Sequence, residues 1–217
     1  MQETYQIHPV SPPTLSPTLT TLQNLQLTTH HPTPPLGPNS ALVRIHAVAL
    51  NARDIMVLSH SPAYPVPTSP GLTPCSDGAG IVTAVGADSV WAVGDRVLLH
   101  TNAWVEGSDV RDFDLQSVCG GGDVQGTLMQ CKVVRDEVLL RMPGNLGFEE
   151  AACLPTAGGT AVNALLFGPV AVGPGMVVLV QGTGGVSVAA LQVRFFLSLA
   201  LISGSTSGEH KGWGVDG

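Results

Sequence analysis

Charged and aromatic side chains are scarce in this sequence. Of its 217 residues, 12% are charged and 5% aromatic, whereas 44% are apolar. The apolar fraction is sufficient for a packed core, but a soluble domain normally carries more charge on its surface. We therefore expect part of the surface to be covered by further chain or by a partner.

Clusters of basic residues are missing as well. The formal net charge is −7, and no stretch concentrates lysine and arginine. Nucleic-acid binding needs a basic surface, so we expect no nucleic-acid partner. The first ten residues lack a basic start followed by an apolar run, which argues against a secretory signal.

No stretch has the length and composition of a membrane span. The most apolar candidate, residues 186–202, carries Gln192 and Arg194 at its centre. A bilayer needs about 20 apolar residues, and a central arginine is costly there. We expect no membrane association, and a membrane-anchored fragment is the weakest alternative.

Paired cysteines are also absent. The four cysteines are widely spaced, which argues against a zinc ribbon or a redox dithiol and favours reduced thiols in a cytoplasmic protein: Cys75, Cys119, Cys131 and Cys153. Two other patterns could suggest a metal. His30 and His31 lie in a proline-rich stretch without further ligands, and the acidic residues at 109–114 do not have calcium-loop spacing. We interpret both as solvated loops.

One stretch has the order strand, tight turn, helix. The β-branched run at 177–180 stops at a glycine cluster, and small apolar residues then resume with helical character. Glycines let the backbone turn sharply, and a helix start offers free N–H groups to a pyrophosphate. The pattern is a variant of the dinucleotide-binding fingerprint, with Ser187 in place of the usual third glycine. A plain structural turn is the alternative.

The chain before this stretch is rich in short strand patterns. An edge strand is predicted at 4–8, a second strand around Leu22 to Leu27, and a proline loop at 30–38. Residues 41–50 alternate clearly, and further strands are predicted at 81–86, 97–99, 126–134 and 138–142. Short helices are predicted at 51–58, 148–152 and 158–166. Many short strands separated by turns indicate a small β-barrel-like domain.

The order of these motifs resembles the medium-chain dehydrogenase/reductase superfamily. The resemblance is carried by LVRIHAVALNARD at 42–54, PCSDGAGIV at 74–82, VGDRV at 93–97, EEAACLP at 149–155, Thr160-Ala161 and the Gly182 turn. It implies an α/β protein in which a GroES-like, β-barrel-like domain precedes a Rossmann unit. We expect N-terminal strands and a loop at 1–40, the GroES-like catalytic domain at 41–155, the start of the Rossmann domain at 156–192, and an off-family tail at 193–217.

The resemblance also decides between two branches of the superfamily. In zinc-dependent alcohol dehydrogenases a cysteine, a His-Glu pair and a second cysteine hold the catalytic metal. The corresponding residues here are Asn51, Ser76-Asp77 and, approximately, Thr156. None supplies a thiolate or an imidazole, and the four-cysteine structural zinc loop is missing too. The chain is therefore similar to the zinc-independent quinone oxidoreductases and their alcohol-dehydrogenase-like relatives, and we expect no metal.

In that branch, the resemblance implies NAD(P)H-dependent hydride transfer to a quinone, an enone or another carbonyl compound. Asn51 and Tyr64 are the predicted catalytic residues, near the nicotinamide and in the substrate loop. The predicted cofactor-binding residues are Thr160, Gly182, Thr183, Gly184, Gly185, Val186 and Ser187. Each has a structural alternative, since Asn51 could end a strand, Tyr64 cover a loop and Thr160 cap a helix.

The chain departs from the family after Gln192. Leu201 and Ile202 fall where a second Rossmann strand would lie, and residues 205–207 with Lys211 fall where a cofactor 2′-phosphate would bind. We expect the remaining half of the nucleotide-binding sheet to be missing, as in a truncated product. A lone strand–turn–helix unit cannot bury its own apolar surface, so we expect residues 176–202 to be poorly packed and cofactor affinity to be weak. The alternative is an inactive GroES-like fragment with at most an interaction role. A homodimer fits either interpretation.

Overall fold

The computed structural model describes residues 1–8, 19–101, 109–170, 172–173, 175–197 and 200–204. The chain divides into two compact units, Met1–Thr156 and Ala157–Gly217. The fold class is α/β, as predicted. Within the described ranges, no helix is long and apolar enough to cross a membrane.

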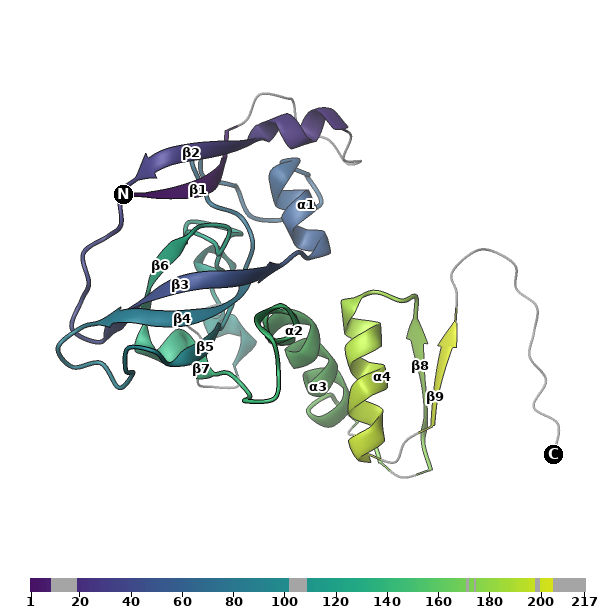
Figure 1. Cartoon of the computed structure of the whole chain (residues 1–217). Helices are drawn as coiled ribbons and strands as arrows, with labels where there is room; N and C mark the ends of the chain where they lie inside the picture. Colours follow the sequence, from purple (N-terminus) through teal and green to yellow (C-terminus); the bar gives the residue numbers. More distant parts are fainter. Residues whose placement is uncertain (9–18, 102–108, 171, 174, 198–199, 205–217) are drawn as a thin grey trace. The chain divides into compact units, whose positions relative to one another are not determined.

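The first unit is built around a five-stranded antiparallel sheet in the order β6-β3-β4-β5-β7 (Figure 1). Alternation along β3 and its neighbours sends one set of side chains into a common core, which includes Val43, Val82, Val97 and Val134. The strands are β3 (Ser40–Ala49), β4 (Asp77–Val85), β5 (Arg96–Leu99), β6 (Cys131–Arg135) and β7 (Leu139–Arg141).

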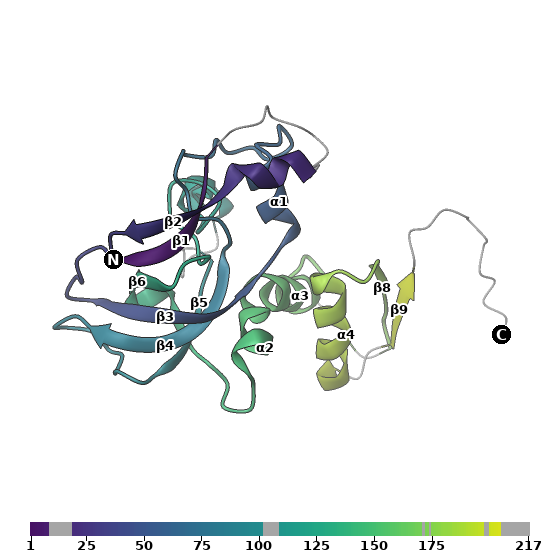
Figure 2. The same cartoon turned by 45° about the horizontal axis from the view of Figure 1, so that its top comes forward.

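A two-stranded antiparallel ribbon accompanies this sheet (Figure 2). It consists of β1 (Gln2–Ile7) and β2 (Leu25–His31), with the 3-10 helix η1 (Leu19–Asn24) between them in the chain. Two predictions are wrong here. The second strand starts at Leu25, because Leu22 belongs to η1, and His30 and His31 lie in β2 rather than in a loop.

The strand predicted at 126–134 is also shorter than expected, since β6 starts at Cys131. The preceding backbone finds irregular partners instead of a strand. The N–H of Gly126 donates to the carbonyl of Thr73, and the N–H of Gln130 donates to the carbonyl of Glu3. These bonds fasten the segment to the β1 ribbon and to the approach to β4.

Short helices close the first unit. Helix α1 (Ala52–Leu58) follows β3, and helix α2 (Phe148–Ala152) packs on β3 and β4. Ala151 and Ala152 of α2 are buried with Ala79, Leu98 and Met142. The short 3-10 helices η2 (Val110–Asp112), η3 (Leu115–Ser117) and η4 (Asp136–Val138) lie in connections. A π-helical turn, η5 (Leu154–Gly158), was not predicted.

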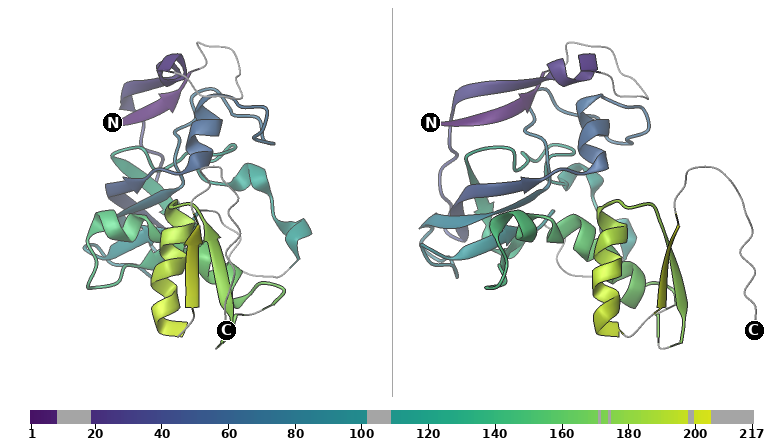
Figure 3. Two further views of the ribbon diagram at one scale, coloured as in Figure 1. Left: turned by 90° about the vertical axis from the view of Figure 1, so that its right-hand side faces the viewer. Right: turned by 45° about the vertical axis from the view of Figure 1, so that its right-hand side comes forward.

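The second unit contains α3 (Gly159–Leu166), β8 (Val177–Gln181), α4 (Gly185–Leu197) and β9 (Ala200–Gly204). Strands β8 and β9 are parallel, and α4 lies between them and α3 (Figure 3). Val178 and Val180 face the small core, whereas Val177 and Leu179 on the other side of β8 are 63% and 62% exposed. Leu201 and Ile202 lie in β9, where the resemblance puts a second strand.

Candidate functional site

A buried carboxylate organises the polar residues at the start of β4. Asp77 is completely inaccessible to solvent and accepts four hydrogen bonds. Its Oδ1 atom accepts from the hydroxyls of Ser76 at 3.0 Å and Thr156 at 2.6 Å. Its Oδ2 atom accepts from the Asn51 amide and from the backbone N–H of Thr156, both at 3.2 Å.

The sheet register creates this cluster. Asp77 pairs with Ala49 across β3 and β4, and Asn51 follows β3 at the start of α1. Thr156 comes from the π-helical turn η5, far along the chain. Charge-assisted hydrogen bonds of this kind are stronger than neutral ones, so the four donors compensate for burial of the carboxylate.

The cluster contains the positions that correspond to the zinc ligands of the resemblance, and its donor set does not fit zinc. Asn51, Ser76 and Thr156 offer an amide and two hydroxyls, and both oxygens of Asp77 already accept hydrogen bonds. The part of the chain that the structure describes contains no group of three or more His, Cys, Asp or Glu residues arranged to hold a metal.

Behind Asn51 lies a second buried carboxylate. The backbone N–H of Asn51 donates to Asp54 Oδ2 at 2.8 Å, which caps α1, and Arg53 forms an ion pair with Asp54 at 3.2 Å. Burial raises the pKa of Asp54, and the bond from Asn51 and the charge of Arg53 oppose that rise. Asn51 therefore does more than end a strand, because its backbone N–H holds the carboxylate of Asp54 and its side-chain amide holds that of Asp77.

The loop after α1 contains a pocket with unsatisfied polar atoms. Tyr64 and His60 line this pocket of about 390 Å³ together with Met56 and Val66. The Tyr64 hydroxyl and His60 Nε2 are both buried without a hydrogen-bond partner in the described structure. Burial lowers the pKa of His60, which favours the neutral imidazole. Buried polar atoms normally have partners, so both residues lack a hydrogen-bonding group that a ligand could supply. The Tyr64 hydroxyl itself lies beside Gly121, which does not line this pocket.

The two predicted catalytic residues line different pockets. Asn51 borders a pocket of about 440 Å³ whose walls are mostly apolar and include Leu50, Ile55 and Leu58. Leu50 is 77% exposed and Ile55 50% exposed, so this pocket lies beneath an apolar patch of surface. The pocket lined by Tyr64 has none of these residues in its walls.

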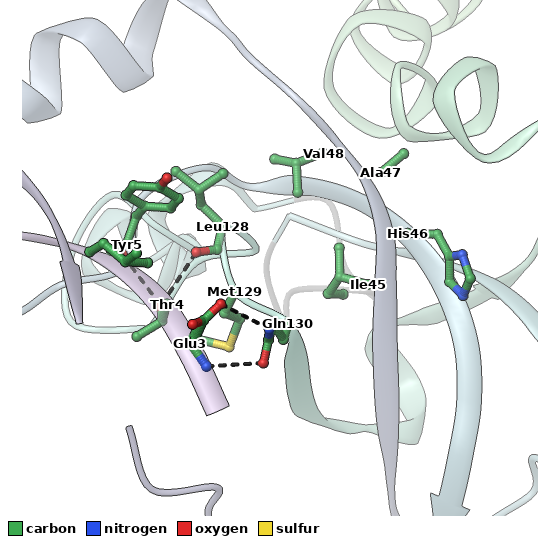
Figure 4. A pocket seen from close by; sticks show the side chains of 11 residues that line it. Glu3, Thr4, Tyr5, Ile45, His46, Ala47, Val48, Leu128, Met129 and Gln130 are labelled. Carbon is green, nitrogen blue, oxygen red and sulfur yellow. Dashed lines mark hydrogen bonds between the residues drawn. The ribbon is translucent and has the colours of Figure 1, made fainter. Parts of the chain in front are cut away.

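A third pocket, of about 340 Å³, lies between β1 and β3 and contains no predicted site residue (Figure 4). Two lining residues, Glu3 and Gln130, are joined by a reciprocal pair of hydrogen bonds. The backbone N–H of Glu3 donates to Gln130 Oε1 at 3.0 Å, and Gln130 Nε2 donates to Glu3 Oε2 at 3.2 Å. Because these polar groups satisfy one another, the pocket offers little to anchor a ligand.

The glycine turn of the second unit fits a dinucleotide. Gly182 has a φ of +74°, which glycine adopts without strain, and a Cβ atom added at Gly182 or Gly184 would meet nothing within 4 Å. Gly185 packs against another segment instead, since a Cβ atom added at Gly185 would lie 3.2 Å from Cβ of Ala157. Open space at the turn and free N–H groups at the start of α4 suit a pyrophosphate.

The other predicted cofactor residues differ in exposure. Thr160 in α3, Thr183 and Val186 are exposed. Ser187 is buried, and its hydroxyl donates to the carbonyl of Gln181 at 3.0 Å, so it ties α4 to β8. Residues 205–207 and Lys211, the predicted 2′-phosphate site, lie outside the described residues.

Sequence reasoning missed the central role of Asp77 and the presence of His60 beside Tyr64. Asp77 had entered only as a residue unable to replace a zinc-binding imidazole. The available signal was the polar pair Ser76-Asp77 directly before an apolar strand. A carboxylate buried at such a position is costly unless hydrogen-bond donors surround it. His60 carried no distinctive local pattern.

Comparisons with known proteins agree on the type of domain. The alcohol dehydrogenase GroES-like domain matches residues 37–144. A zinc-type alcohol dehydrogenase-like protein of Schizosaccharomyces pombe is 41% identical over 162 residues, which cover 72% of this chain and 45% of that protein. The quinone oxidoreductase of Sus scrofa is 28% identical over 180 residues, which cover 82% of this chain and 46% of that protein.

Solved structures show the same likeness. A putative alcohol dehydrogenase from Sinorhizobium meliloti superimposes with a TM-score of 0.76 at 30% identity, over 93% of this chain and 56% of the other. The chain thus spans about half the length of the relatives it matches. With its GroES-like domain and the strand–turn–helix unit that follows, it belongs to the medium-chain dehydrogenase/reductase superfamily.

Proposed function

We propose that this chain derives from an NAD(P)H-dependent, zinc-independent oxidoreductase that transfers hydride to a quinone, an enone or another carbonyl compound. The observation that carries the proposal is the cluster around Asp77. Amide and hydroxyl groups occupy the metal-ligand positions of the resemblance and satisfy the carboxylate completely. A reaction in the first unit would therefore rely on hydrogen bonds and on the positioning that this cluster provides, instead of a Lewis acid.

The cofactor belongs to the second unit in this proposal. Gly182, Gly184 and the N–H groups at the start of α4 would hold the pyrophosphate, and Thr160 would contribute on the nicotinamide side. When bound, the reduced nicotinamide supplies the hydride. Ser187 acts indirectly, because its hydroxyl is engaged with Gln181 and fixes the turn.

The acceptor belongs to the first unit. The Tyr64 hydroxyl and His60 Nε2 are two of the buried side-chain atoms that lack a hydrogen-bond partner among the described residues, and a carbonyl or quinone oxygen that reached them would supply an acceptor. The surrounding Met56, Val66 and prolines suit an apolar substrate body. Asn51 is held by Asp77, so we assign it to fixing the end of β3 and the start of α1 in the orientation that the site needs.

The test is a titration of the purified 217-residue protein with NADPH, followed by nicotinamide fluorescence and thermal melting. Saturable binding with a raised melting temperature is the expected result for an assembled site. Gly184→Ala is the informative variant, since its added methyl group meets only open space in the protein and would intrude on a bound pyrophosphate. If the protein bound neither NADPH nor NADH in this titration, the result would contradict the proposal.

A second candidate is an inactive fragment that acts through contacts with other chains. It is favoured by the exposed face of β8, where Val177 and Leu179 lie on the side away from the core. Leu179→Lys should lower self-association in light scattering without lowering the melting temperature. The matched change on the core side, Val178→Lys, should destabilise the second unit. Equal scattering from wild type and Leu179→Lys would count against this role.

A further inference from the structure

A buried lysine and a buried cysteine meet beside β6. Lys132 lies in β6 opposite Val43 of β3, and its side chain runs inward. Its Nζ atom is 3.2 Å from Sγ of Cys119. Lys132 is 9% exposed and Cys119 is 5% exposed, so protein atoms and not bulk solvent surround both groups.

Among the described residues, the hydrogen-bond partners of the Lys132 amine are neutral. Nζ donates to the backbone carbonyls of Gln125 and, at 3.2 Å, of Gly126, in addition to its contact with Cys119. The ion pairs within the described ranges do not include Lys132. A buried ammonium with neutral partners is costly, so a reaction that converts it into an uncharged group relieves that cost.

Both side chains also line a cavity of about 260 Å³. Most of its remaining wall is apolar and comes from Leu99, Val134 and Val138. A small uncharged oxidant can enter such a cavity more readily than a charged one. The pair is therefore accessible to hydrogen peroxide although neither residue is exposed on the surface.

We propose that Cys119 and Lys132 form a covalent sulfur–oxygen–nitrogen bridge on exposure to hydrogen peroxide. In the first step the thiol sulfur attacks peroxide, the O–O bond breaks, and a sulfenic acid and one water form. In the second, the Lys132 ammonium has lost a proton to solvent, and its amine and the sulfenic acid together give up two hydrogens to a second peroxide. That peroxide becomes two waters, and the N–O bond closes the bridge.

The nearby thiol of Cys75 competes poorly for the same sulfenic acid. A disulfide would require Cys75 to attack as the thiolate, and burial raises the pKa of Cys75, with the negative charge of Asp54 acting in the same direction. Lys132 is held in contact with the Cys119 sulfur by two carbonyls, so its amine is the group best placed for the oxidative closure of the N–O bond.

The experiment treats the full-length chain with dilute hydrogen peroxide and maps the products by mass spectrometry after denaturation and trypsin digestion. No lysine or arginine lies between Arg111 and Lys132, so Cys119 and Lys132 belong to one tryptic peptide. The expected product is the internally bridged peptide 112–135, with a gain of about 14 Da from one added oxygen and two lost hydrogens. Trypsin should no longer cleave after Lys132, and a thiol reductant should restore both the mass and the cleavage. The bridge closes a loop, so it should raise the melting temperature by about 5 °C.

Three variants separate the bridge from ordinary oxidation. Lys132→Met removes the amine and should leave Cys119 as a sulfenic or sulfinic acid, with gains of about 16 or 32 Da. Lys211→Met, a change at the chain's other lysine, should leave the bridge intact, and so should Cys153→Ser, which removes an exposed thiol.

The wild-type digest decides the matter even if Lys132→Met does not fold. Oxidation of Cys119 with unimpaired cleavage after Lys132 would overturn the proposal. So would a loss of about 2 Da that links Cys119 to Cys75 as a disulfide.

Discussion

At the scale of single residues, the carboxylate of Asp77 should be the most sensitive polar group of the first unit. Asp77→Asn replaces an acceptor-only group by one that presents an N–H toward existing donors of Asn51, Ser76 and Thr156. Leaving buried donors unsatisfied should cost about 2–4 kcal/mol of unfolding free energy. Urea unfolding measures this loss, and the exposed Asp88→Asn serves as control. A loss equal to that of the control would contradict the role of Asp77.

Asp54 gives a residue-scale prediction about pH. Its pKa is raised above the usual value of 3.8, chiefly by burial, so the folded state binds its proton more tightly than the unfolded state does. This contribution to stability is present below the unfolded pKa and is lost as pH rises through the higher folded pKa. Melting temperatures measured upward from pH 3.8 should therefore fall more steeply for wild type than for Asp54→Asn. Parallel curves would show that Asp54 does not titrate in this way.

At the scale of elements, the turn between β8 and α4 depends on the conformation of one glycine. Gly182 has a φ of +74°, a region in which a β-branched side chain is strained by about 1–3 kcal/mol. Gly182→Val should therefore lower the stability of the second unit. Faster hydrogen exchange of the β8 amides would measure this loss. Gly184→Ala is the matched control for folding. If both variants exchanged like wild type, the turn would not have the backbone described.

The elements also show which predictions the sequence could support. Alternation in residues 41–50 correctly predicted β3, and the acids at the start of the helix at 148–152 correctly predicted α2. Both signals are local, because they depend on neighbours within a few residues. The start of β6 was wrong by several residues, since hydrogen bonds to Glu3 and Thr73, distant in the chain, hold residues 126–130 out of the strand.

At the scale of the whole molecule, the two units should unfold separately. The main apolar clusters of the first unit, around Val43 and Leu98, are formed entirely from residues before 157. A chain of residues 1–156 should therefore melt cooperatively, with a midpoint close to that of the same unit in the full chain. Circular dichroism on both proteins measures this. A broad transition in the shorter chain would show that the first unit depends on the second.

The sequence by itself determined the fold class, the positions of most strands and helices, and the lack of zinc-type ligands at Asn51, Ser76-Asp77 and Thr156. These follow from residue type and short-range periodicity. Only the tertiary structure decided that Asp77 is the centre of the polar cluster, that His60 joins Tyr64 in one pocket, and that Lys132 meets Cys119. Thr156 and Asp77 are 79 positions apart, so their hydrogen bond exists only after β4 has paired with β3 and η5 has closed over it. No local pattern encodes such a contact, because it depends on how the sheet brings distant segments together.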